Sequence, residues 1–425
     1  MPSLSRRAVI TGLGVISPLG LELSSFWNAL REGRSGVRRL QVHDPGALPV
    51  RFGGEVVGFD PRTFLDKKDR KRLSIMAPPF QFVAAASKLA LEHAQLDSEK
   101  INPTRFGIVF GSSTVPHELK DLGPAATLSA DHERENINLK KWGEKGLPLV
   151  PPMWMLSHIP NMHACHVSII QNTQGPINTI TQSDVAGLIT LGEAWRYLQC
   201  GRADLVLAGA GDSTLTTINF IRHCLISPLS QRNEEPEKAS RPFDKNRDGW
   251  VLGEGAGVLL VESLEHATKR GAPILAELAG FAATFDRGRT GTGLARAIVQ
   301  AMQQANISAA DIDHISAQGN SSPWADAFES RAITKAFGTD GGGPPVLAVK
   351  SYVGHLGAAG SPVELAASIL AMKEGSLPAT LNYETPDPAC PINVARHPKT
   401  VRTPYFLKIA FTEMGQCAVA VLRKF

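Results

Sequence analysis

The chain has 425 residues, of which 43% are hydrophobic and 20% charged, and its formal net charge of +4 at pH 7 is too small to indicate nucleic-acid binding. No apolar run reaches the length of a membrane-spanning helix and the amino terminus has no signal-peptide cleavage pattern, so a cytoplasmic protein without a membrane span is expected. The five cysteines are odd in number and far apart, which argues against a disulfide framework and is typical of free thiols in a reducing compartment.

The first half of the chain alternates between strand-like and helix-like stretches. RAVITG at 7–12 predicts a short strand, and GLGVISPLG, which begins at Gly12, predicts a loop. The Gly-Leu-Gly of this loop lacks the third glycine of a dinucleotide-binding motif, so no phosphate cradle is expected. The other predicted elements of this half are helices at 23–31, 79–96 and 159–170 and a buried strand at 106–111.

Two polar segments interrupt this alternation. KKDRKR at 67–72 is expected to be a solvated helix face, and a docking patch for an acidic carrier protein is the second interpretation. Residues 113–150 have mixed polarity with several glycines and prolines, and we expect them to form an excursion on the surface.

The stretch from Asn178 to Gly209 predicts a strand, a tight turn, a helix and a second strand. Its apolar residues recur with helical spacing between 188 and 198, and Gly201 separates this helix from the strand that follows. A residue at such a turn lies over a helix N-terminus, where backbone N–H groups and the macrodipole favour negative charge. The residue at this turn is therefore expected to be a nucleophile or a helix cap.

The second half of the chain repeats the alternation of strands and helices. Strands are predicted at 257–262, 274–280, 314–317, 346–350, 405–410 and 417–422, and helices at 294–306, 325–337 and 362–374. Each half has one loop-to-helix elbow, at 183–194 and at 355–366. This pattern predicts a duplicated α/β unit with sites at the strand ends, made of an amino-terminal half at 1–262 and a carboxy-terminal half at 263–425.

Four stretches of the sequence resemble the β-ketoacyl-acyl carrier protein synthases of fatty acid and polyketide synthesis. They are VITGLGVISPLG near the start, RPFDKNRDGWVLGEGAGVLLVESLEHATKRGAPILAEL at 241–278, KSYVGHLGAAGSPVELAASIL at 350–370 and LPATLNYETPDPACPINV at 377–394. The resemblance covers nearly the whole chain apart from about 113–150 and a shortened region around 283–293.

This resemblance implies the thiolase fold, a five-layer αβαβα arrangement of two similar halves. It also implies a homodimer or a heterodimer with a related, cysteine-bearing chain, and an acyl carrier protein as the partner that delivers the substrate. Members of the family are acyltransferases in which a Cys at the elbow accepts an acyl group, two His residues help to decarboxylate the malonyl-carrier protein, and a Lys completes the site. No cofactor and no metal are expected.

The sequence departs from that family pattern at the catalytic positions. Aligning Gly187 and the Gly-Glu-Ala at 192–194 with the family's elbow places Asp184 at the position of the nucleophilic Cys, next to Ser183. SAQGNSSP replaces the family stretch that holds the first His and puts Gln318 in its place, with Asn320 and Ser322 at the positions of carrier-arm-binding hydroxyls. Two of the three catalytic residues of the family are therefore replaced.

Other positions of the family's site are retained or altered. The second His is kept as His355, with Lys350 before it, and Glu364 is expected to form a buried ion pair with Lys350. The carboxy-terminal loop, a Gly-Phe-Gly-Gly hinge in the family, here reads AFTEMGQ. Phe411 is retained, and Glu413 replaces the family's gating Phe, so the pocket mouth is expected to be more polar.

Three functions are compatible with these replacements. The first is a non-condensing partner subunit like the chain-length factors, in which Ser183 and Asp184 serve as helix N-caps. The second is an enzyme acting on acyl- or malonyl-carrier protein, such as a hydrolase or a decarboxylase, with Asp184, His355, Lys350 and Glu413 converging on one pocket as an acid–base set. The third is a non-catalytic protein that binds an acyl chain or a carrier arm.

Overall fold

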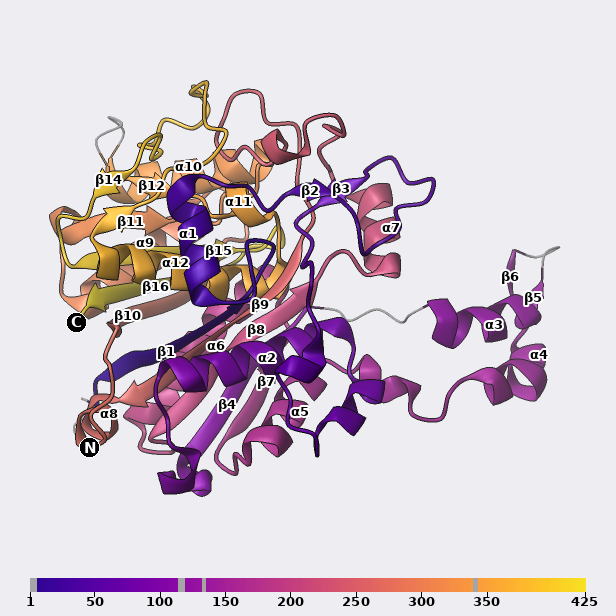
Figure 1. Cartoon of the computed structure of the whole chain (residues 1–425). Helices are drawn as coiled ribbons and strands as arrows, with labels where there is room; N and C mark the ends of the chain where they lie inside the picture. The colour runs from indigo at the N-terminus through magenta and orange to yellow at the C-terminus, as the bar shows by residue number, and fades with distance from the viewer. Residues whose placement is uncertain (1–5, 114–118, 132–134, 339–342) are drawn as a thin grey trace.

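The computed structural model describes residues 6–113, 119–131, 135–338 and 343–425, and ten of their strands form one continuous sheet (Figure 1). The order across the sheet is β12-β11-β15-β16-β10-β1-β9-β8-β4-β7. These strands are β1 (Ala8–Ile16), β4 (Phe106–Gly111), β7 (Ile177–Ile180), β8 (Leu205–Ser213), β9 (Glu254–Ser263), β10 (Ala276–Phe285), β11 (Ile312–Ser316), β12 (Val346–Leu347), β15 (Tyr405–Phe411) and β16 (Gln416–Lys424).

The sheet consists of two sets of five strands with the same topology. From the outer edge of the sheet inward, the first set is β7-β4-β8-β9-β1 and the second is β12-β11-β15-β16-β10. If the strands of each set are numbered 1 to 5 along the chain, both sets have the spatial order 3-2-4-5-1. Within each set the first two pairings are parallel and the other two antiparallel. The expected duplicated α/β unit is therefore present.

The two sets meet through a short antiparallel pairing between β1 and β10, which joins Ala8–Ile10 to Ala276–Leu278. Because this pairing makes the sheet continuous, strand connectivity alone does not separate two domains. The division of the chain between residues 262 and 263 stays a prediction.

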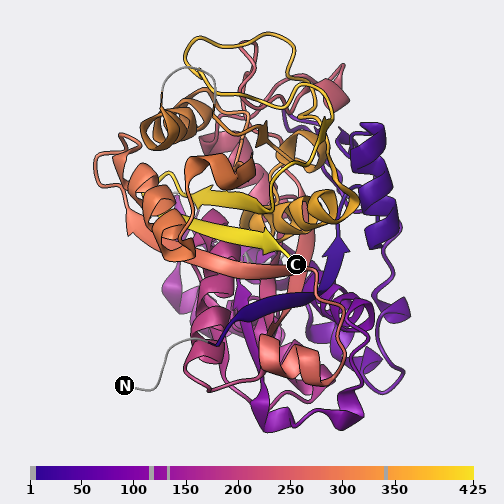
Figure 2. The same ribbon diagram turned by 90° about the vertical axis from the view of Figure 1, so that its left-hand side faces the viewer.

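Two buried helices lie between the strand sets, and other helices cover the outer faces. Helix α6 (Ala186–Gln199) contacts strands of both sets, and α12 (Gly360–Glu374) packs against β9 on one side and β15 on the other. Helices α2 (Pro78–His93) and α5 (Met162–Gln171) cover the first set, and α9 (Thr292–Ala305) and α10 (Pro323–Phe337) cover the second (Figure 2). The expected five-layer αβαβα arrangement is confirmed.

Helix α12 illustrates why the central layer is buried on all sides. Every residue from Gly360 to Met372 is buried, and the sequence in this span is made mostly of small and aliphatic residues. Apart from Glu364, which is paired with buried lysines, and two serines, this span is apolar on every face, and such a helix is stable only inside a core.

The remaining elements connect these layers or lie outside them. They are α1 (Leu23–Glu32), α7 (Thr217–Ile226), α8 (Leu264–Lys269) and α11 (Lys350–Val353), the short strand pairs β2 (Arg38–Arg39) with β3 (Phe52–Gly53) and β13 (Ser376–Leu377) with β14 (Lys399–Thr400), and within the excursion α3 (Leu119–Ser129), β5 (Ala130–Asp131), β6 (Asn136–Ile137) and α4 (Leu139–Lys141). The strand predicted at 346–350 is wrong at its end, because Lys350 begins α11.

The predicted loop at 12–20 is also wrong in its first part, because β1 continues to Ile16. Leu13, Val15 and Ile16 are fully buried, and the strand pairs with β9 over nearly its whole length. Gly14 allows this strand to lie against α2, since a Cβ at this position would be 1.8 Å from the carbonyl oxygen of Ala86. The glycines that suggested a loop are therefore required by close backbone packing.

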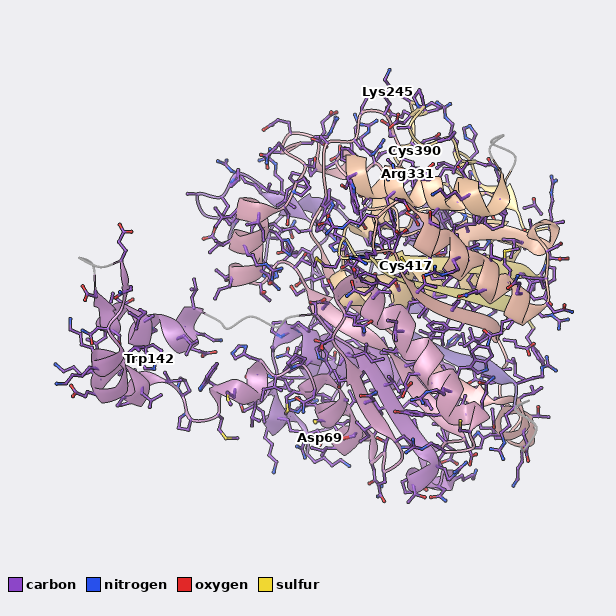
Figure 3. All side chains as sticks on the ribbon, turned by 180° about the vertical axis from the view of Figure 1, so that it is seen from behind. Asp69, Trp142, Lys245, Arg331, Cys390 and Cys417 are labelled. Atoms are coloured by element: carbon purple, nitrogen blue, oxygen red, sulfur yellow. The ribbon has the colours of Figure 1, made fainter. Side chains whose placement is uncertain are left out.

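The excursion after β4 projects away from the layered body as a separate arm (Figure 1), and Trp142 lies on it (Figure 3). Few of its residues are buried; these include Ala125, Ser129 and Val150. Several large apolar side chains of this region are instead exposed, namely Leu119, Leu128, Ile137, Leu139, Leu147, Leu149, Met153 and Met155. A segment with this composition cannot bury its own apolar surface.

In the part of the chain that the structure describes, no helix combines the length and apolar character needed to cross a bilayer.

Close packing of β1 on α2 gives a stability prediction. We expect Gly14→Ala to lower the free energy of unfolding by about 3 kcal/mol or more, the upper end for overpacking, because the new methyl group meets backbone rather than a movable side chain. Gly143→Ala on the arm is the matched control, since a Cβ there meets nothing within 4 Å, and it should change stability by less than about 1 kcal/mol. Urea unfolding of both variants measures the difference, and equal midpoints would contradict the packing argument.

Candidate active site

The two elbows predicted from the sequence bring Asp184 and His355 together. Asp184 lies in a 3-10 turn (Ser183–Val185) that follows β7 and leads into α6, and His355 lies between α11 and the turn that leads into α12. The Asp184 Oδ1 atom is 3.1 Å from Nε2 of His355. Corresponding positions ahead of the two central helices thus form one pair, a carboxylate facing an imidazole.

Neither Ser183 nor Asp184 caps the helix, so the expectation of N-capping is wrong. The N-cap residues of the turn and of α6 are Gln182 and Val185 respectively, and neither terminus has a side-chain capping hydrogen bond. Ser183 adopts a positive φ of 50°, an uncommon conformation for a residue with a side chain. This conformation turns the chain sharply, and the Asp184 carboxylate binds His355 rather than the N–H groups of the helix.

The backbone and the ring of His355 contact the segment that precedes β9. Its N–H donates to the carbonyl oxygen of Val251 at 2.7 Å, and its ring lies 4.9 Å from the ring of Trp250. The Thr214 hydroxyl donates to its carbonyl oxygen at 3.4 Å. The Nδ1 atom is buried and has no hydrogen-bond partner among the described residues. Of the two ring nitrogens, Nε2 is therefore the one that is engaged, by Asp184.

The pair borders a cavity of about 770 Å³, and Glu413 lines the same cavity. Its walls include residues one or two positions after the end of a strand, Ser113 after β4, Thr181 after β7, Thr214 after β8 and Thr412 after β15. The cavity thus lies at the carboxyl ends of parallel strands, as predicted for a site in an α/β fold.

The carboxylates of the cavity have opposite pKa shifts. Burial opposes the ionisation of Asp184, but the positive charge and hydrogen bond of His355 outweigh it, so the pKa of Asp184 lies below its usual value. Burial and the negative charge of Asp184 raise the pKa of Glu413. Two carboxylic acids whose pKa values are shifted in opposite directions can serve as a general base and a general acid.

The cavity also contains cationic and imidazole groups that the sequence did not single out. Arg222 and His223 of α7 both line it. Burial and the charge of His355 lower the pKa of His223 to about 4, so its ring is neutral at pH 7. Nothing in the sequence around α7 indicates this placement, because it depends on the packing of that helix over the cavity.

Lys350 does not line the cavity, contrary to the expected convergence of four groups on one pocket. Its Nζ atom is 2.5 Å from Oε1 of Glu364 and donates to the carbonyl oxygen of Gln318 at 2.9 Å. The other oxygen of Glu364 forms an ion pair with Lys408, whose side chain is fully buried and also donates to the carbonyl oxygen of Ala317. Lys350 therefore belongs to a buried charge cluster beside the cavity.

Lys408 was missed by the sequence analysis, although a signal was present. It is the single charged residue in the strand YFLKIAF, at a position where its side chain must point into the core. Burial lowers its pKa, and the charge of Glu364 acts in the opposite direction. A buried lysine requires a buried carboxylate, and the predicted pair of Lys350 with Glu364 is in fact a cluster of three.

Gln318, Asn320, Ser322 and Phe411 are buried and do not line the cavity. The side-chain oxygen of Gln318 accepts a hydrogen bond from the Phe411 N–H at 2.6 Å. The hydroxyl of Ser322 accepts from Ala325 N–H at 3.5 Å at the start of α10. The roles expected for these residues in catalysis and carrier-arm binding stay predictions, and the structure places them behind the wall of the cavity.

None of the five cysteines lines the cavity. Cys390 and Cys417, labelled in Figure 3, are buried in the carboxy-terminal half, and burial raises the pKa of each thiol to about 12. Cys165, Cys200 and Cys224 are half-buried or exposed at other places. No thiolate is therefore positioned to replace the absent nucleophile.

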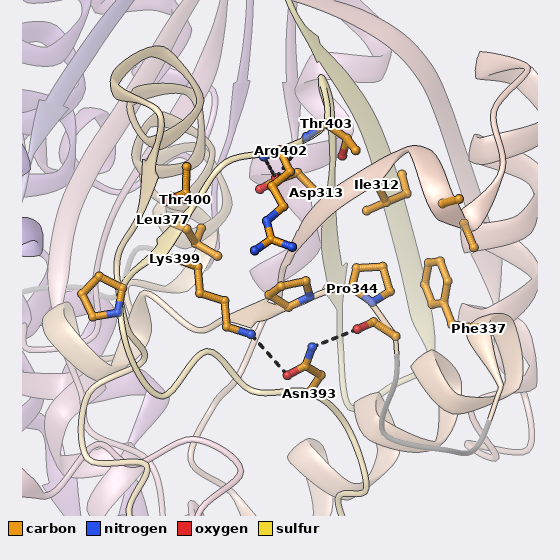
Figure 4. A pocket seen from close by; sticks show the side chains of 15 residues that line it. Ile312, Asp313, Phe337, Pro344, Leu377, Asn393, Lys399, Thr400, Arg402 and Thr403 are labelled. Atoms are coloured by element: carbon orange, nitrogen blue, oxygen red, sulfur yellow. Dashed lines mark hydrogen bonds between the residues drawn. The ribbon is translucent and has the colours of Figure 1, made fainter.

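A second cavity, of about 780 Å³, lies at the opposite ends of the strands (Figure 4). The side chains of Lys399 and Arg402 extend into it, and Asp313 accepts a hydrogen bond from Arg402 N–H at 2.6 Å. It contains no residue of the predicted site. Over the described ranges, no group of three or more His, Cys, Asp and Glu side chains is arranged to hold a metal ion.

Comparison with known proteins identifies the family. The model of the β-ketoacyl synthase N-terminal domain matches residues 5–267, and that of the C-terminal domain matches residues 275–384. The chain belongs to the β-ketoacyl synthase family. It is 34% identical to 3-oxoacyl-[acyl-carrier-protein] synthase 2 of Synechocystis sp., over 91% of this chain and 90% of that protein.

Solved structures of ketosynthases resemble the whole β-ketoacyl synthase chain. The ishigamide ketosynthase/chain length factor is 27% identical, with a TM-score of 0.85 over 99% of both chains. A type II polyketide synthase ketosynthase, solved with its acyl-carrier protein, is 30% identical, with a TM-score of 0.81 over 99% of both chains. The thiolase fold implied by the sequence is confirmed, and it belongs to enzymes of fatty acid and polyketide synthesis.

The buried charge cluster of this β-ketoacyl synthase homologue gives a second stability prediction. Glu364→Gln removes the carboxylate that forms ion pairs with both Lys350 and Lys408, so we expect a loss of about 3–5 kcal/mol in the free energy of unfolding. Adding Lys408→Met to Glu364→Gln should restore part of this loss, because one buried charge is removed. Chemical denaturation measures Glu364→Gln, Lys408→Met and the double variant, and additive losses would show that the charges are not coupled.

His223 gives a prediction about pH. Its folded pKa of about 4 is below the unfolded value of about 6.5, so the unfolded chain takes up a proton first as the pH falls. Its contribution to stability is fully present above pH 6.5 and decreases as the pH falls toward 4. We expect His223→Gln to reduce the loss of stability between pH 7 and pH 5 by about 2 kcal/mol. Unfolding at both pH values tests this, and an unchanged difference would contradict it.

Proposed function

We propose that this chain is a non-condensing partner subunit of the β-ketoacyl synthase family, related in role to a chain-length factor. The observation that carries the proposal is the carboxylate of Asp184 paired with His355 Nε2 at 3.1 Å, in a cavity that no thiol lines. Condensation in the family requires a thiolate at this elbow. The described residues offer an ion pair there instead.

The chemistry of the pair disfavours condensation. A carboxylate is a far poorer nucleophile toward a thioester than a thiolate, and the acyl anhydride that it forms is readily hydrolysed. Asp184 is a still weaker nucleophile because the ion pair with His355 stabilises its negative charge. His355 in turn has its Nε2 atom occupied by Asp184, so this nitrogen is not free to donate to a reacting carbonyl group.

The arm and the sheet edge support a second chain as partner. Several large apolar side chains of the arm are exposed, with Leu139 at 80% and Leu147 at 56%. Strand β7 is the edge of the sheet beside β4, and Ile177 on it is 46% exposed. Surfaces of this kind are typical of protein interfaces. A heterodimer with a cysteine-bearing ketosynthase is the assembly that we favour over a homodimer.

An acyl carrier protein is the second proposed partner. Lys67, Lys68 and Lys71 are exposed in the charge run at 67–72, whereas Arg72 is paired with Asp69 at 3.4 Å. The exposed lysines form a small basic surface, which suits an acidic protein. The related ketosynthase solved with its acyl-carrier protein is consistent with this proposal.

The second candidate function is an enzyme that hydrolyses or decarboxylates acyl- or malonyl-carrier protein. The observation that favours it is the opposite shift of the pKa values of Asp184 and Glu413 in one cavity with His355. Perturbed acids in a cleft are common in catalytic sites, but structural ion pairs produce them too. A protein that binds an acyl chain or a carrier arm without turnover is the third candidate.

Activity of the purified chain distinguishes these functions. We expect no hydrolysis or decarboxylation of acyl- or malonyl-carrier protein by the chain alone, and co-purification with a cysteine-bearing homologue when the two are co-expressed. If the chain alone turns over either substrate, and Asp184→Ala abolishes that turnover, the chain is an enzyme rather than a non-condensing subunit. Glu235→Gln, a change in an exposed surface pair with Lys238, is a control that should leave either result unchanged.

Restoring the family's residues tests whether only two groups are missing. We expect Asp184→Cys combined with Gln318→His to recover less than about 1% of the condensation rate of a family synthase, because His355 and the turn at 411–416 remain adapted to the present site. Acylation of the new Cys is followed by mass spectrometry and condensation by product analysis. Recovery of ordinary rates would show that the rest of the site is intact.

A further inference from the structure

The turn between β15 and β16 is closed by its own hydrogen bonds. Thr412 N–H donates to the carbonyl oxygen of Gln416 at 2.9 Å, and Gly415 N–H donates to that of Thr412 at 3.0 Å. Gln416 N–H also donates to the hydroxyl of Thr412 at 3.2 Å. Glu413 and Met414 form the tip of this turn, and both line the cavity of Asp184 and His355.

The turn is also attached to the neighbouring strand of the sheet. Asp286 N–H, just after β10, donates to the carbonyl oxygen of Gly415 at 2.8 Å. Gly415 has a φ of 102°, and a Cβ there would be 2.6 Å from the carbonyl oxygen of Asp286. This side of the turn therefore requires glycine and is fixed to β10 through the backbone.

Gln318 fixes the other side of the turn. Its side-chain oxygen accepts the N–H of Phe411, the last residue of β15, at 2.6 Å, and its side chain is almost completely buried. On one side, Phe411 pairs with Cys417 of β16. On the other side, the pairing of β15 with β11 ends at Lys408, so no strand residue there accepts from the Phe411 N–H. The ring of Phe411 lies 4.8 Å from the ring of Phe328 and cannot move without opening the core.

Gln318 is itself held from two directions. Its N–H and that of Gly319 donate to the two carboxylate oxygens of Glu329, at 2.7 and 2.8 Å. Its carbonyl oxygen accepts from Lys350 Nζ at 2.9 Å. The backbone of Gln318 is thus fixed by buried groups on α10 and α11, independently of the turn that its side chain binds.

We propose that Gln318 is a positioning residue whose side chain fixes the 411–416 turn and thereby holds Glu413 at the Asp184–His355 pair. The side chain at position 318 therefore acts on backbone and does not enter the cavity. Access to the pair is then governed by the side chains of Glu413 and Met414, with the main chain of the turn held in place. This inference does not depend on whether the site turns over a substrate.

The consequence for the site is chemical as well as steric. A fixed turn keeps a second carboxylate near Asp184, which is the arrangement that raises the pKa of Glu413. Glu413 is exposed at the cavity, and if the turn were free to swing, its carboxylate would move away from Asp184 and lose that repulsion. The Gln318 hydrogen bond therefore contributes to both the entrance and the charge of the cavity.

Hydrogen exchange measured by mass spectrometry on the full chain tests the proposal. Gln318→Met keeps the length of the side chain but removes its strong acceptor, and Gln318→Glu keeps an acceptor oxygen. We expect amide exchange in fragments spanning 411–416 to be at least tenfold faster in Gln318→Met, with β8 and β9 unchanged. In Gln318→Glu the exchange of the turn should stay within about threefold of the original protein.

Two outcomes would overturn the proposal. One is unchanged exchange at 411–416 in a folded Gln318→Met variant, and the other is faster exchange throughout β15 and β16, which a purely structural role would produce. If Gln318→Met does not fold, a crystal structure of Gln318→Glu decides the question. In that structure the proposal requires Glu413 to keep its place near His355. A displaced 411–416 turn, although the side chain at position 318 still has an acceptor oxygen, would refute the proposal.

Discussion

The ion pair of Asp184 with His355 is the interaction on which the chemistry of this chain depends. Each member is placed at the N-terminal end of a central helix, Asp184 before α6 and His355 before α12, and those helices are buried between the two strand sets. The pair therefore follows from the duplication of the fold. A thiolate at this elbow would leave His355 Nε2 free for the reacting carbonyl, whereas a carboxylate occupies it.

A second set of buried charges supports the wall behind this pair. Lys408 Nζ binds the carbonyl oxygens of Ser316 and Ala317, and Lys350 Nζ binds that of Gln318, so two ammonium groups hold three successive carbonyl groups. Glu364 on α12 forms an ion pair with each of the two lysines. The segment that carries Gln318 is thus fixed at its backbone. This leaves the Gln318 side chain free to bind Phe411, a role for which a rigid support is required.

The sequence predicted the parts of this structure that depend on local pattern or on repetition. The alternation of strands and helices, the duplicated unit and the two elbows could be predicted because each has a local signal, and the elbows placed Asp184 and His355 in equivalent positions. Contacts between elements far apart in the sequence were harder to predict. Gly14 was interpreted as part of a loop because its contact is with Ala86, more than seventy residues away. Lys408 was overlooked because the need for its charge arises from a different element, α12.

The distribution of apolar surface also bears on function. The cavity contains Glu413, Arg222 and His223 in addition to the ion pair, so a long alkyl chain entering it would have to desolvate charged and polar groups at a cost of several kcal/mol. Large apolar side chains are exposed on the arm, where Leu139 is 80% exposed, and also at the cavity itself, where Ile226 and Met414 are 70% and 67% exposed. The apolar side chains of the arm do not line the cavity, and an exposed surface of this kind favours contact with another protein. The charged groups of the cavity and the apolar surface of the arm together make the partner-subunit function more consistent with the structure than a protein that stores acyl chains.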